Sequence, residues 1–423
     1  MHSTSTLPPQ SRFHVVIIGA GLGGLCLAQG LKKNGISVAV YEKDASPFSR
    51  SQGYCIRIDQ TGRHALQACL PPHRYLAFER TCAGSASGPN AGVAGVNTVN
   101  GRLETLAGKW VDSWRDGRHG ETPDLRADRQ TMRRVLLDGL QDCVHFGKQF
   151  LHYEERDDGK VLAHFVNGAS VTADVLVAAD GIHSAVAAQR FPHLKTIDSG
   201  NVCIYGKTPL TDQSRMAVAS SLQTGTTVIF EKELTGVVDA MRFDPSACGK
   251  DQTPPDDYLY WALVGDRQRF GLDKESDLRL SPENLGKLID NVTAHWKPSL
   301  KVLYQLSDPG MRTVVAIRTA PIPTAWEASR VTALGDAIHA MSPAGGLGAN
   351  TALNDAAMLS QVLLEAGNEA RDDAASGKST CDTVTPAIDL YETLMCARGF
   401  AAVHASDHGG RQLLGKDETS IVC

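Results

Sequence analysis

The first forty residues of the chain combine short apolar runs with one segment of helical periodicity. Phe13 to Ile18 is almost wholly apolar and rich in β-branched residues, which is typical of a strand buried on both faces. Apolar residues recur at helical spacing over 22–31, and Gly35 favours the end of a helix there. Residues 36–41 repeat the composition of the first run. This order predicts two parallel strands joined by a right-handed helical crossover.

Later segments extend the same pattern. Residues 131–140 regain helical periodicity, and 171–179 and 331–334 have the composition of buried strands. Two further helices are predicted over 350–365 and 388–405. Together these segments predict more strands of one parallel sheet with helices packed on it.

The pattern changes between residues 191 and 326. Short runs rich in β-branched and aromatic residues, such as 201–205, 226–230 and 258–264, are separated by Pro, Gly and Asp turns. They predict a mostly antiparallel sheet in a second, α+β domain. We therefore expect an α/β protein with a Rossmann-like domain and a second domain. Surface loops are predicted in three polar stretches: 83–101, 112–124 and 366–385.

Composition narrows the possible functions. The chain has 423 residues, of which 42% are hydrophobic, as in ordinary globular proteins. A net charge of -5 predicts no nucleic-acid partner. The ten Cys form no CxxC pair and no zinc-ligand spacing with His, so no metal is predicted. The start, Met1 to Ser11, has no apolar signal region, and no stretch reaches the roughly 18 apolar residues of a membrane span. We expect a cytoplasmic protein, either a monomer or a homodimer.

A glycine-rich turn follows the first predicted strand. Gly19, Gly21 and Gly24 form the GxGxxG pattern between that strand and the helix. In this pattern the first glycine makes the tight turn, the second lets a pyrophosphate approach the backbone, and the third lets the helix pack closely. The helix begins near Leu22, and its N-terminal N–H groups can hold phosphate oxygens. The turn predicts a dinucleotide site.

The end of the second predicted strand supports this site. Glu42 lies 23 residues after Gly19, where an acidic residue accepts hydrogen bonds from an adenosine ribose. Lys43 follows it and is a further candidate for the cofactor. These residues alone do not distinguish FAD from NAD.

Two motifs far downstream make that distinction. Asp180-Gly181 follows one predicted buried strand, and Gly335-Asp336 follows another. The segment 343–350, rich in Gly and Pro, then opens a helix. These motifs and the glycine turn, in this order over nearly the whole chain, resemble the group A flavoprotein monooxygenases, the family of para-hydroxybenzoate hydroxylase.

The resemblance implies that FAD is the cofactor and assigns residues to it. Asp336 would hold a ribityl hydroxyl of FAD, and Asp180 and Gly181 would lie near both FAD and a passing nicotinamide. Backbone N–H groups at the start of the downstream helix would face the pyrimidine edge of the flavin and stabilise its anionic reduced form. These groups belong to Gly346, Gly348, Ala349 and Asn350.

Several arginines are further candidates. Arg129 opens a segment similar to the family's Arg-x-x-Leu-Arg and would contact the FAD ribityl chain or phosphate. Arg50 could reach a nicotinamide phosphate or the flavin edge, and Arg57 could line the active site. For these two arginines a solvated surface role stays open. The family usually has Arg where this chain has Ala187, and Arg190 could take over the expected nicotinamide contact.

The resemblance also implies a reaction. NADPH or NADH would bind transiently and reduce FAD, and O2 would then form a C4a-(hydro)peroxyflavin that hydroxylates or epoxidises an electron-rich aromatic, enolic or indolic substrate. Secondary metabolism is the suggested setting. Tyr205 could hydrogen-bond or deprotonate a phenol. For Tyr260 and Trp261 a core position is favoured over a ligand contact, and for His183 and His339 a structural role in the turn is favoured.

Three alternatives remain open. Baeyer–Villiger oxidation uses the same flavin chemistry on a ketone. A flavin-dependent reductase that transfers no oxygen shares the fold, and a non-enzymatic FAD-binding scaffold is the third. A halogenase is disfavoured because Trp-x-Trp-x-Ile-Pro is absent.

The family pattern divides the chain into alternating parts. FAD-binding parts are expected at 12–82, 126–190 and 329–365. Substrate-domain strands and loops are expected at 83–125, and the substrate domain proper at 191–328. A loop and a C-terminal helix are expected over 366–423.

Overall fold

A parallel sheet forms one half of the computed structural model, which describes residues 13–47, 49, 54–84, 96–106, 124–248, 254–372 and 380–415. Its strand order is β16-β10-β1-β2-β6, and every neighbouring pair is parallel. The strands are β1 (His14–Ile18), β2 (Ser37–Tyr41), β6 (Val144–His145), β10 (Val175–Ala178) and β16 (Val331–Ala333). They come from segments far apart in the sequence, so the chain returns to this sheet several times.

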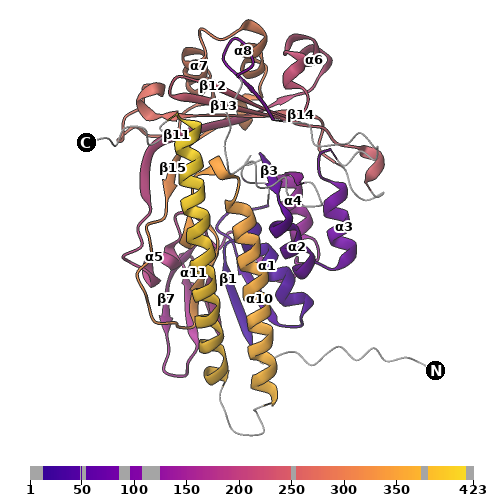
Figure 1. The fold of residues 1–423 in the computed structure, drawn as a ribbon. Coiled ribbons are helices and arrows are strands. Elements are labelled where there is room, and N and C mark those ends of the chain that lie inside the picture. The colour runs from indigo at the N-terminus through magenta and orange to yellow at the C-terminus, as the bar shows by residue number, and fades with distance from the viewer. Residues whose placement is uncertain are drawn as a thin grey trace, which may run out of the picture.

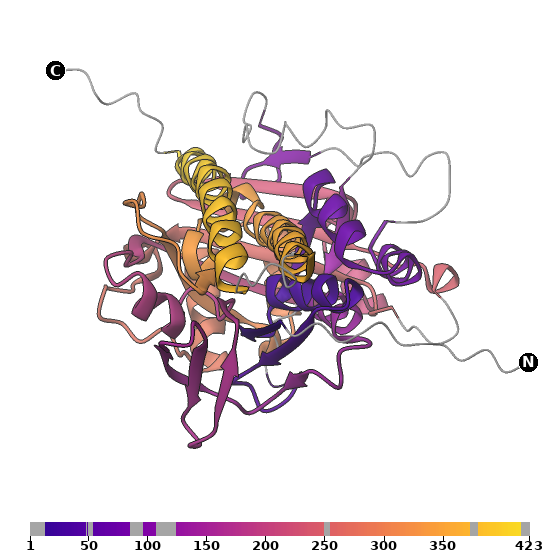
Figure 2. The ribbon, with the colours of Figure 1, turned by 90° about the horizontal axis from the view of Figure 1, so that it is seen from below.

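The crossover between β1 and β2 follows the predicted pattern. Helix α1 (Leu22–Lys33) buries its apolar face, and Gly35 follows it at a φ of 71°, a left-handed conformation that glycine adopts without steric cost. Helix α10 (Gly348–Asp372) packs against α1 and against α2 (Gln60–Cys69) and α11 (Thr380–Leu413). Figure 2 shows these helices from below.

The second half is a six-stranded sheet with the order β15-β11-β14-β13-β12-β4. Its pairs are antiparallel except β12 with β4, which are parallel. In Figure 1 this sheet lies across the top of the molecule, above the parallel sheet. Its strands are β4 (Val96–Val99), β11 (Ile197–Pro209), β12 (Thr226–Glu231), β13 (Leu234–Met241), β14 (Tyr258–Asp266) and β15 (Thr313–Thr319).

One face of this second sheet carries its own hydrophobic core. Trp261, on β14, is fully buried and contacts Tyr304 edge-on, at a ring distance of 5.0 Å. Trp261 therefore has the core position that the sequence favoured. Three helices belong to this part of the chain: α6 (Asp212–Ala217), α7 (Pro282–Val292) and α8 (Pro298–Gln305). The opposite face of the six-stranded sheet faces the parallel sheet.

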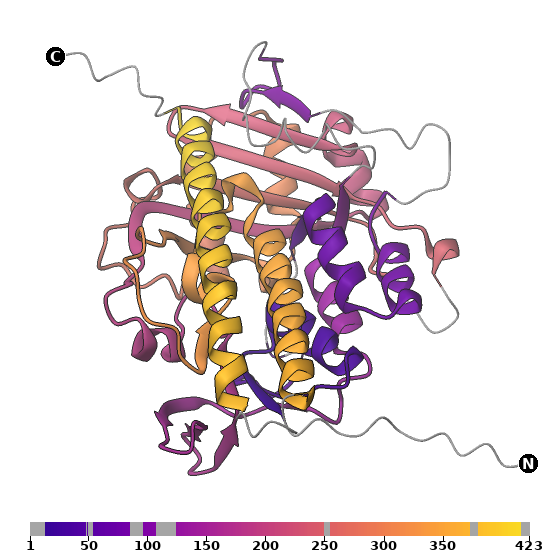
Figure 3. The same cartoon turned by 60° about the horizontal axis from the view of Figure 1, so that its bottom comes forward.

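Two small sheets and the remaining helices connect these halves. Strands β3 (Cys55–Ile58) and β5 (Leu125–Asp128) pair with each other, and β7 (Phe150–Glu155), β8 (Val161–Phe165) and β9 (Ser170–Ala173) form a three-stranded sheet. Figure 3 shows α10 and α11 running side by side up to the six-stranded sheet. The helices not yet named are α3 (Pro72–Arg80), α4 (Arg129–Leu137), α5 (Ala185–Arg190) and α9 (Asp336–His339).

Three sequence predictions need correction. The single strand predicted over 171–179 is two strands, because Asp174 between them is buried and accepts hydrogen bonds from the His14 backbone N–H and from Lys160. The loop predicted over 83–101 contains β4 at Val96–Val99, which pairs with β12. The loop predicted over 366–385 is helical at 366–372 and 380–385, because α10 and α11 extend into it.

The α/β class with a mostly antiparallel second sheet is confirmed. The domain boundaries stay a prediction. The N-terminal arm and parts of the expected loops, 85–95, 112–123 and 373–379, lie outside the described residues. Among the helices that the structure describes, none combines the length and the apolar character needed to span a membrane.

Candidate active site

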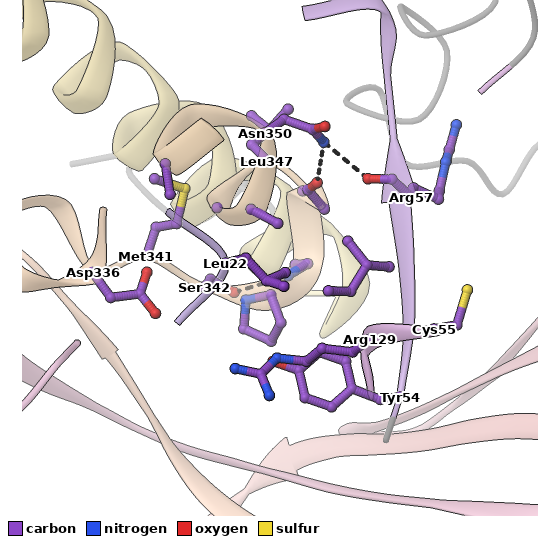
Figure 4. A pocket seen from close by; sticks show the side chains of 18 of the residues that line it. Leu22, Tyr54, Cys55, Arg57, Arg129, Asp336, Met341, Ser342, Leu347 and Asn350 are labelled. Atoms are coloured by element: carbon purple, nitrogen blue, oxygen red, sulfur yellow. Dashed lines mark hydrogen bonds between the residues drawn. The ribbon is translucent and has the colours of Figure 1, made fainter. Parts of the chain in front are cut away.

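A cavity of about 700 Å³ lies between the two large sheets. One wall is formed by the segments that follow three parallel strands, at Gly21, Ala179 and Gly335. The opposite wall is formed by side chains of β13 and β14. In open parallel sheets, ligands bind outside the carboxyl ends of the strands, which is where this cavity lies. Figure 4 shows part of the lining.

The three glycines of the turn have different neighbours. Gly19 has a φ of 110°, and a Cβ there would lie 2.3 Å from the Ala179 carbonyl oxygen. A Cβ on Gly24 would lie 2.2 Å from the Gly19 carbonyl oxygen. A Cβ on Gly21 would instead come no closer than 3.9 Å to the protein, and Gly21 lines the cavity. Gly19 and Gly24 are therefore required by the fold, whereas the space beside Gly21 is open to a ligand.

Glu42 organises this turn from within the protein. The residue is buried, and its carboxylate accepts hydrogen bonds from the backbone N–H groups of Ala20, at 2.8 Å, and Asp44, at 2.9 Å. Leu22 lines the cavity beside the turn. Lys43 is exposed and lies outside the cavity lining. A ribose contact by Glu42 would therefore use a carboxylate that is already fixed in place.

Asp336 and Asp180 follow β16 and β10, but only Asp336 is part of the cavity lining. Asp336 lines the cavity, and burial raises its pKa against the opposing charges of His339 and Arg129. Asp180 accepts a hydrogen bond from the Ala185 backbone N–H, but its buried Oδ1 has no hydrogen-bond partner among the described residues. Gly181 lines the cavity next to it. Asp336 can therefore accept a hydrogen bond from a ligand in the cavity, whereas Asp180 lies between the lining residues Ala179 and Gly181 without being part of the lining.

The start of α10 forms another part of the cavity wall. Gly346, Gly348, Ala349 and Asn350 all line the cavity, as the sequence predicted for a ligand at this helix N-terminus. The Asn350 side chain is used within the protein. It donates hydrogen bonds to the carbonyl oxygens of Arg57 and Gly346, at 3.0 Å and 3.2 Å, and accepts one from the Asp59 backbone N–H. Backbone groups are therefore what this segment offers to a ligand.

The candidate arginines and Tyr205 differ in position. Arg129 lines the cavity with its guanidinium carbon 5.3 Å from the Tyr54 ring centre, and Figure 4 shows it on the same side as Asp336. Arg57 also lines the cavity, paired with Asp124 at 2.5 Å. Tyr205 is not part of the lining. Its ring contacts Tyr54 edge-on at 5.2 Å, and burial raises its pKa, which disfavours a phenolate.

The cavity lining includes neither Ala187 nor Arg190, the two positions of α5 that the sequence linked to the nicotinamide. Arg50 lies outside the described residues. Ala187 is buried in α5. Arg190 donates hydrogen bonds to the carbonyl oxygens of Val331, at 3.2 Å, and Glu327, so its guanidinium is already engaged. His183, the other histidine of these motifs, is exposed.

A fully buried ion pair lies behind the cavity and was not foreseen. His339 Nε2 is 2.5 Å from Asp355 Oδ2, which also accepts a hydrogen bond from the Gly335 backbone N–H at 3.1 Å. Burial alone would lower the pKa of His339, but Asp355 outweighs it and the net shift is upward. The structural role favoured for His339 agrees with this contact. A polar Asp355 on the apolar face of a predicted helix was the signal available in the sequence.

A second group of ionisable side chains lies outside the cavity. Strands β7 and β8 carry three side chains whose possible metal-ligand atoms lie within 4.8 Å of one another: His152, Glu154 and His164. The two imidazoles stack in parallel, 13° apart, with ring centres 4.4 Å apart. Because the lone pair of an imidazole nitrogen lies in the ring plane, stacked parallel rings do not aim at one metal ion.

Comparisons with known proteins agree with this geometry. A family described as "FAD binding domain" matches residues 290–376, and one described as "NAD(P)-binding Rossmann-like domain" matches residues 17–79. The crystal structure of a candidate FAD-containing monooxygenase from Photorhabdus luminescens is similar to this chain, with a TM-score of 0.76. The two sequences are 31% identical, and the match covers 97% of this chain and 100% of that chain.

Two curated relatives are fungal. A dual O-methyltransferase/FAD-dependent monooxygenase of Cercospora beticola is 33% identical over 98% of this chain and 48% of its own length. The chain thus spans about half the length of that relative. An FAD-dependent monooxygenase of Trichoderma harzianum is 26% identical, with 93% of this chain and 92% of its own length covered.

These matches place the chain in the FAD-dependent monooxygenases, an oxidoreductase family. Within them it belongs to group A, the family of para-hydroxybenzoate hydroxylase that the sequence motifs resembled. FAD is confirmed as the cofactor. The open space beside Gly21 and the buried Asp336 in the cavity wall fit the polar groups of FAD.

Proposed function

We propose that this protein uses FAD, NAD(P)H and O2 to hydroxylate or epoxidise an electron-rich small molecule. The observation that carries this proposal is the continuity of the cavity. The same space that Gly21 and Asp336 line is also lined by Val237 and Ala262 of the antiparallel sheet. A substrate on that sheet would therefore share one cavity with the cofactor.

Each part of the wall has a role in this proposal. When bound, FAD supplies hydride acceptance and the transfer of one oxygen atom from O2. The N-terminus of α1 beside Gly21 would hold its pyrophosphate, and Asp336 would accept a hydrogen bond from its ribityl chain. The N-terminus of α10 places positive dipole potential where negative charge develops on the flavin. The apolar side chains of the sheet would exclude water from the substrate.

The reductant would bind without a domain of its own. The Rossmann-like match over 17–79 covers the end of β1, the glycine turn, α1 and β2, and we assign this turn to FAD. The nicotinamide would approach transiently near Asp180 and Gly181. Because Ala187 and Arg190 provide no free guanidinium there, NADPH and NADH are both compatible with the site.

The names of relatives suggest the setting. The Cercospora relative combines an O-methyltransferase with its monooxygenase, and its match covers about half of its length. Hydroxylation of an aromatic ring creates a hydroxyl group, and an O-methyltransferase can then methylate such a group. We therefore propose a small aromatic substrate in secondary metabolism.

The test is oxygen transfer by the purified, FAD-loaded protein. NADPH or NADH oxidation, O2 uptake and products are measured with a panel of phenols, indoles and cyclic ketones under 18O2. We expect a phenol or indole to stimulate both NAD(P)H oxidation and O2 uptake and to gain one 18O atom. A labelled lactone would instead show Baeyer–Villiger oxidation. NAD(P)H oxidation without labelled product from any panel member would contradict oxygen transfer and favour a reductase.

A further inference from the structure

Three polar side chains lie in a row across the cavity face of the six-stranded sheet. Thr226 on β12 is the direct neighbour of Asp239 on β13, and Asp239 is the direct neighbour of Tyr260 on β14. All three line the cavity. Directly opposed residues of neighbouring strands point to the same face of a sheet. We call Thr226, Asp239 and Tyr260 the polar row.

Asp239 has one satisfied and one open oxygen. Its Oδ1 accepts a hydrogen bond from the Thr226 hydroxyl. Within the described part of the chain, Oδ2 has no hydrogen-bond partner. The Tyr260 hydroxyl also has none there. Two direct cross-strand neighbours on the cavity lining thus offer an open carboxylate oxygen and an open hydroxyl.

Asp239 is largely shielded from bulk water, at 7% exposure, and it lines the cavity. A hydrogen bond that a ligand donates to such a carboxylate is stronger than the same bond in water. Burial raises the pKa of Asp239, and the Thr226 hydrogen bond and the charges of Arg126 and Arg57 oppose that rise. A carboxylate with a raised pKa is a more basic hydrogen-bond acceptor than one in water. The group therefore suits a ligand that donates a hydrogen bond.

The rest of this cavity wall is apolar. Cys203, Val237, Ala262 and Val264 line the cavity from β11, β13 and β14. Val237 and Ala262 are direct cross-strand neighbours, one step along the same face from Asp239 and Tyr260. Short side chains on a sheet make a smooth surface on which a planar ring can lie. The wall thus has an apolar part and one polar end.

We propose that the polar row recognises a phenolic hydroxyl group of an aromatic substrate whose rings lie on the apolar part of this wall. The hydroxyl donates a hydrogen bond to Asp239 Oδ2 and accepts one from Tyr260. Thr226 acts as a positioning residue because it fixes the orientation of the Asp239 carboxylate. This inference rests on the proposed function, since it names the substrate class for the same cavity.

The test compares the binding of two small molecules that differ by one hydrogen-bond donor. The FAD-loaded protein is titrated with 2-naphthol and with 2-methoxynaphthalene, and the change in the flavin absorption spectrum gives each dissociation constant. The methyl ether retains the fused rings but has no O–H. We expect naphthol to bind at least about tenfold tighter, as the loss of a hydrogen bond to a charged group predicts.

Variants assign this preference to the polar row. In D239N, Thr226 still donates to the side-chain oxygen, so the amide NH2 faces the cavity and cannot accept the naphthol hydrogen bond. We expect the preference for naphthol over the ether to fall to less than about threefold. The matched control is D212N, which changes an exposed Asp on α6 and should keep the full preference.

Y260F keeps the proposal testable if D239N loses FAD. It removes one oxygen atom, and we expect a several-fold loss of naphthol affinity with little change for the ether. Equal binding of both probes to the wild-type protein would overturn the proposal. So would an unchanged preference in D239N and Y260F, or no naphthol binding up to its solubility limit.

Failure of this proposal is distinguishable from failure of the proposed function. The titration uses oxidised FAD and needs no NAD(P)H or oxygen transfer. A naphthol preference without labelled product in the 18O2 experiment would sustain the recognition site and contradict the monooxygenase. Labelled product from a phenol, together with binding that does not depend on Asp239, would sustain the monooxygenase and contradict the recognition site.

Discussion

At the scale of single residues, Gly21 and Gly24 separate ligand binding from folding. They lie three positions apart on one turn, but an added methyl group would meet different neighbours. At Gly24 it would lie 2.2 Å from a backbone oxygen, which cannot move aside cheaply. At Gly21 the nearest protein atom would be 3.9 Å away, an ordinary contact distance. The two positions thus provide a matched pair of substitutions.

We expect Gly21→Ala to lose FAD while the apoprotein keeps its stability. The added Cβ occupies the space assigned to the pyrophosphate, so the dissociation constant of FAD should rise at least about tenfold, or about 1.4 kcal/mol. Gly24→Ala should instead lower the unfolding free energy by about 1–3 kcal/mol, as overpacking does. Flavin content after dialysis and urea unfolding of both apoproteins measure the two effects. Normal FAD affinity in Gly21→Ala would show that the pyrophosphate lies elsewhere.

Residue identity was predictable from sequence where a motif fixes the backbone. The glycine turn, Asp336 and the segment ending at Asn350 have such motifs, and the structure places them on one cavity. Asp239 could not be found in this way, and the core position favoured for Tyr260 was wrong, because Tyr260 lines the cavity. The two residues become neighbours only through strand register, which a short sequence run leaves open. Tyr205 lies on β11, which contributes Cys203 to the cavity wall, but Tyr205 itself is outside the lining.

At the scale of secondary-structure elements, Asn350 ties the start of α10 to β3 and α2. Its buried side chain bonds the Arg57 carbonyl oxygen and the Asp59 backbone N–H. Asp59 in turn caps α2, because its carboxylate accepts a hydrogen bond from the Gly62 N–H. Three elements that reach the cavity are therefore held together through one amide.

We expect Asn350→Ala to lower the unfolding free energy by about 2–4 kcal/mol, because it leaves buried backbone groups without partners. FAD binding should also weaken, since the start of α10 is no longer fixed beside the cavity. Chemical unfolding and FAD titration measure both effects. Asn291→Ala, at an exposed position of α7, is the control and should change the unfolding free energy by less than about 0.5 kcal/mol. Unchanged stability in Asn350→Ala would mean that these hydrogen bonds contribute little.

Elements with a strong apolar period were predictable, and their ends were not. Strands β1, β2 and β16 and helix α1 match the predicted runs closely. Helix α11 begins at Thr380, before the predicted residue 388. Its early turns do have an apolar face, because Val384, Ile388 and Tyr391 are fully buried at helical spacing. The polar composition of 366–385 concealed this signal, because solvent-facing positions of a helix and loops have similar residues.

At the scale of the whole molecule, the two halves meet through a buried carboxylate. Asp128 ends β5 and caps α4 by accepting a hydrogen bond from the Thr131 N–H. Its other oxygen is 2.6 Å from Lys207 Nζ of β11 and accepts a hydrogen bond from the Tyr258 hydroxyl of β14 at 3.0 Å. No motif predicts this contact, because its members come from segments about 80 and 130 residues apart, and only the folded chain brings them together.

Lys207 keeps this carboxylate ionised. Burial would raise the pKa of Asp128, but Lys207 outweighs it, and the net shift is downward. A carboxyl whose pKa is lower in the folded state stabilises the fold above its unfolded pKa of about 3.9, and that contribution is lost as the pH falls through the folded value. The Asp128–Lys207 pair should therefore stabilise the protein at neutral pH and not in strong acid.

We expect Lys207→Met to lower the unfolding free energy by about 3–5 kcal/mol at pH 7, because it leaves a buried carboxylate without its cation. The deficit relative to wild type should shrink as the pH falls from 7 through the lowered folded pKa of Asp128, which lies below the unfolded value of about 3.9, because the carboxyl is then protonated in both proteins. Lys207→Met combined with Asp128→Asn should recover part of the loss, since the uncompensated charge is gone. Urea unfolding across this pH range measures all three, with the exposed Lys287→Met as control. A deficit independent of pH would show that packing, and not the charge of Asp128, joins the two halves.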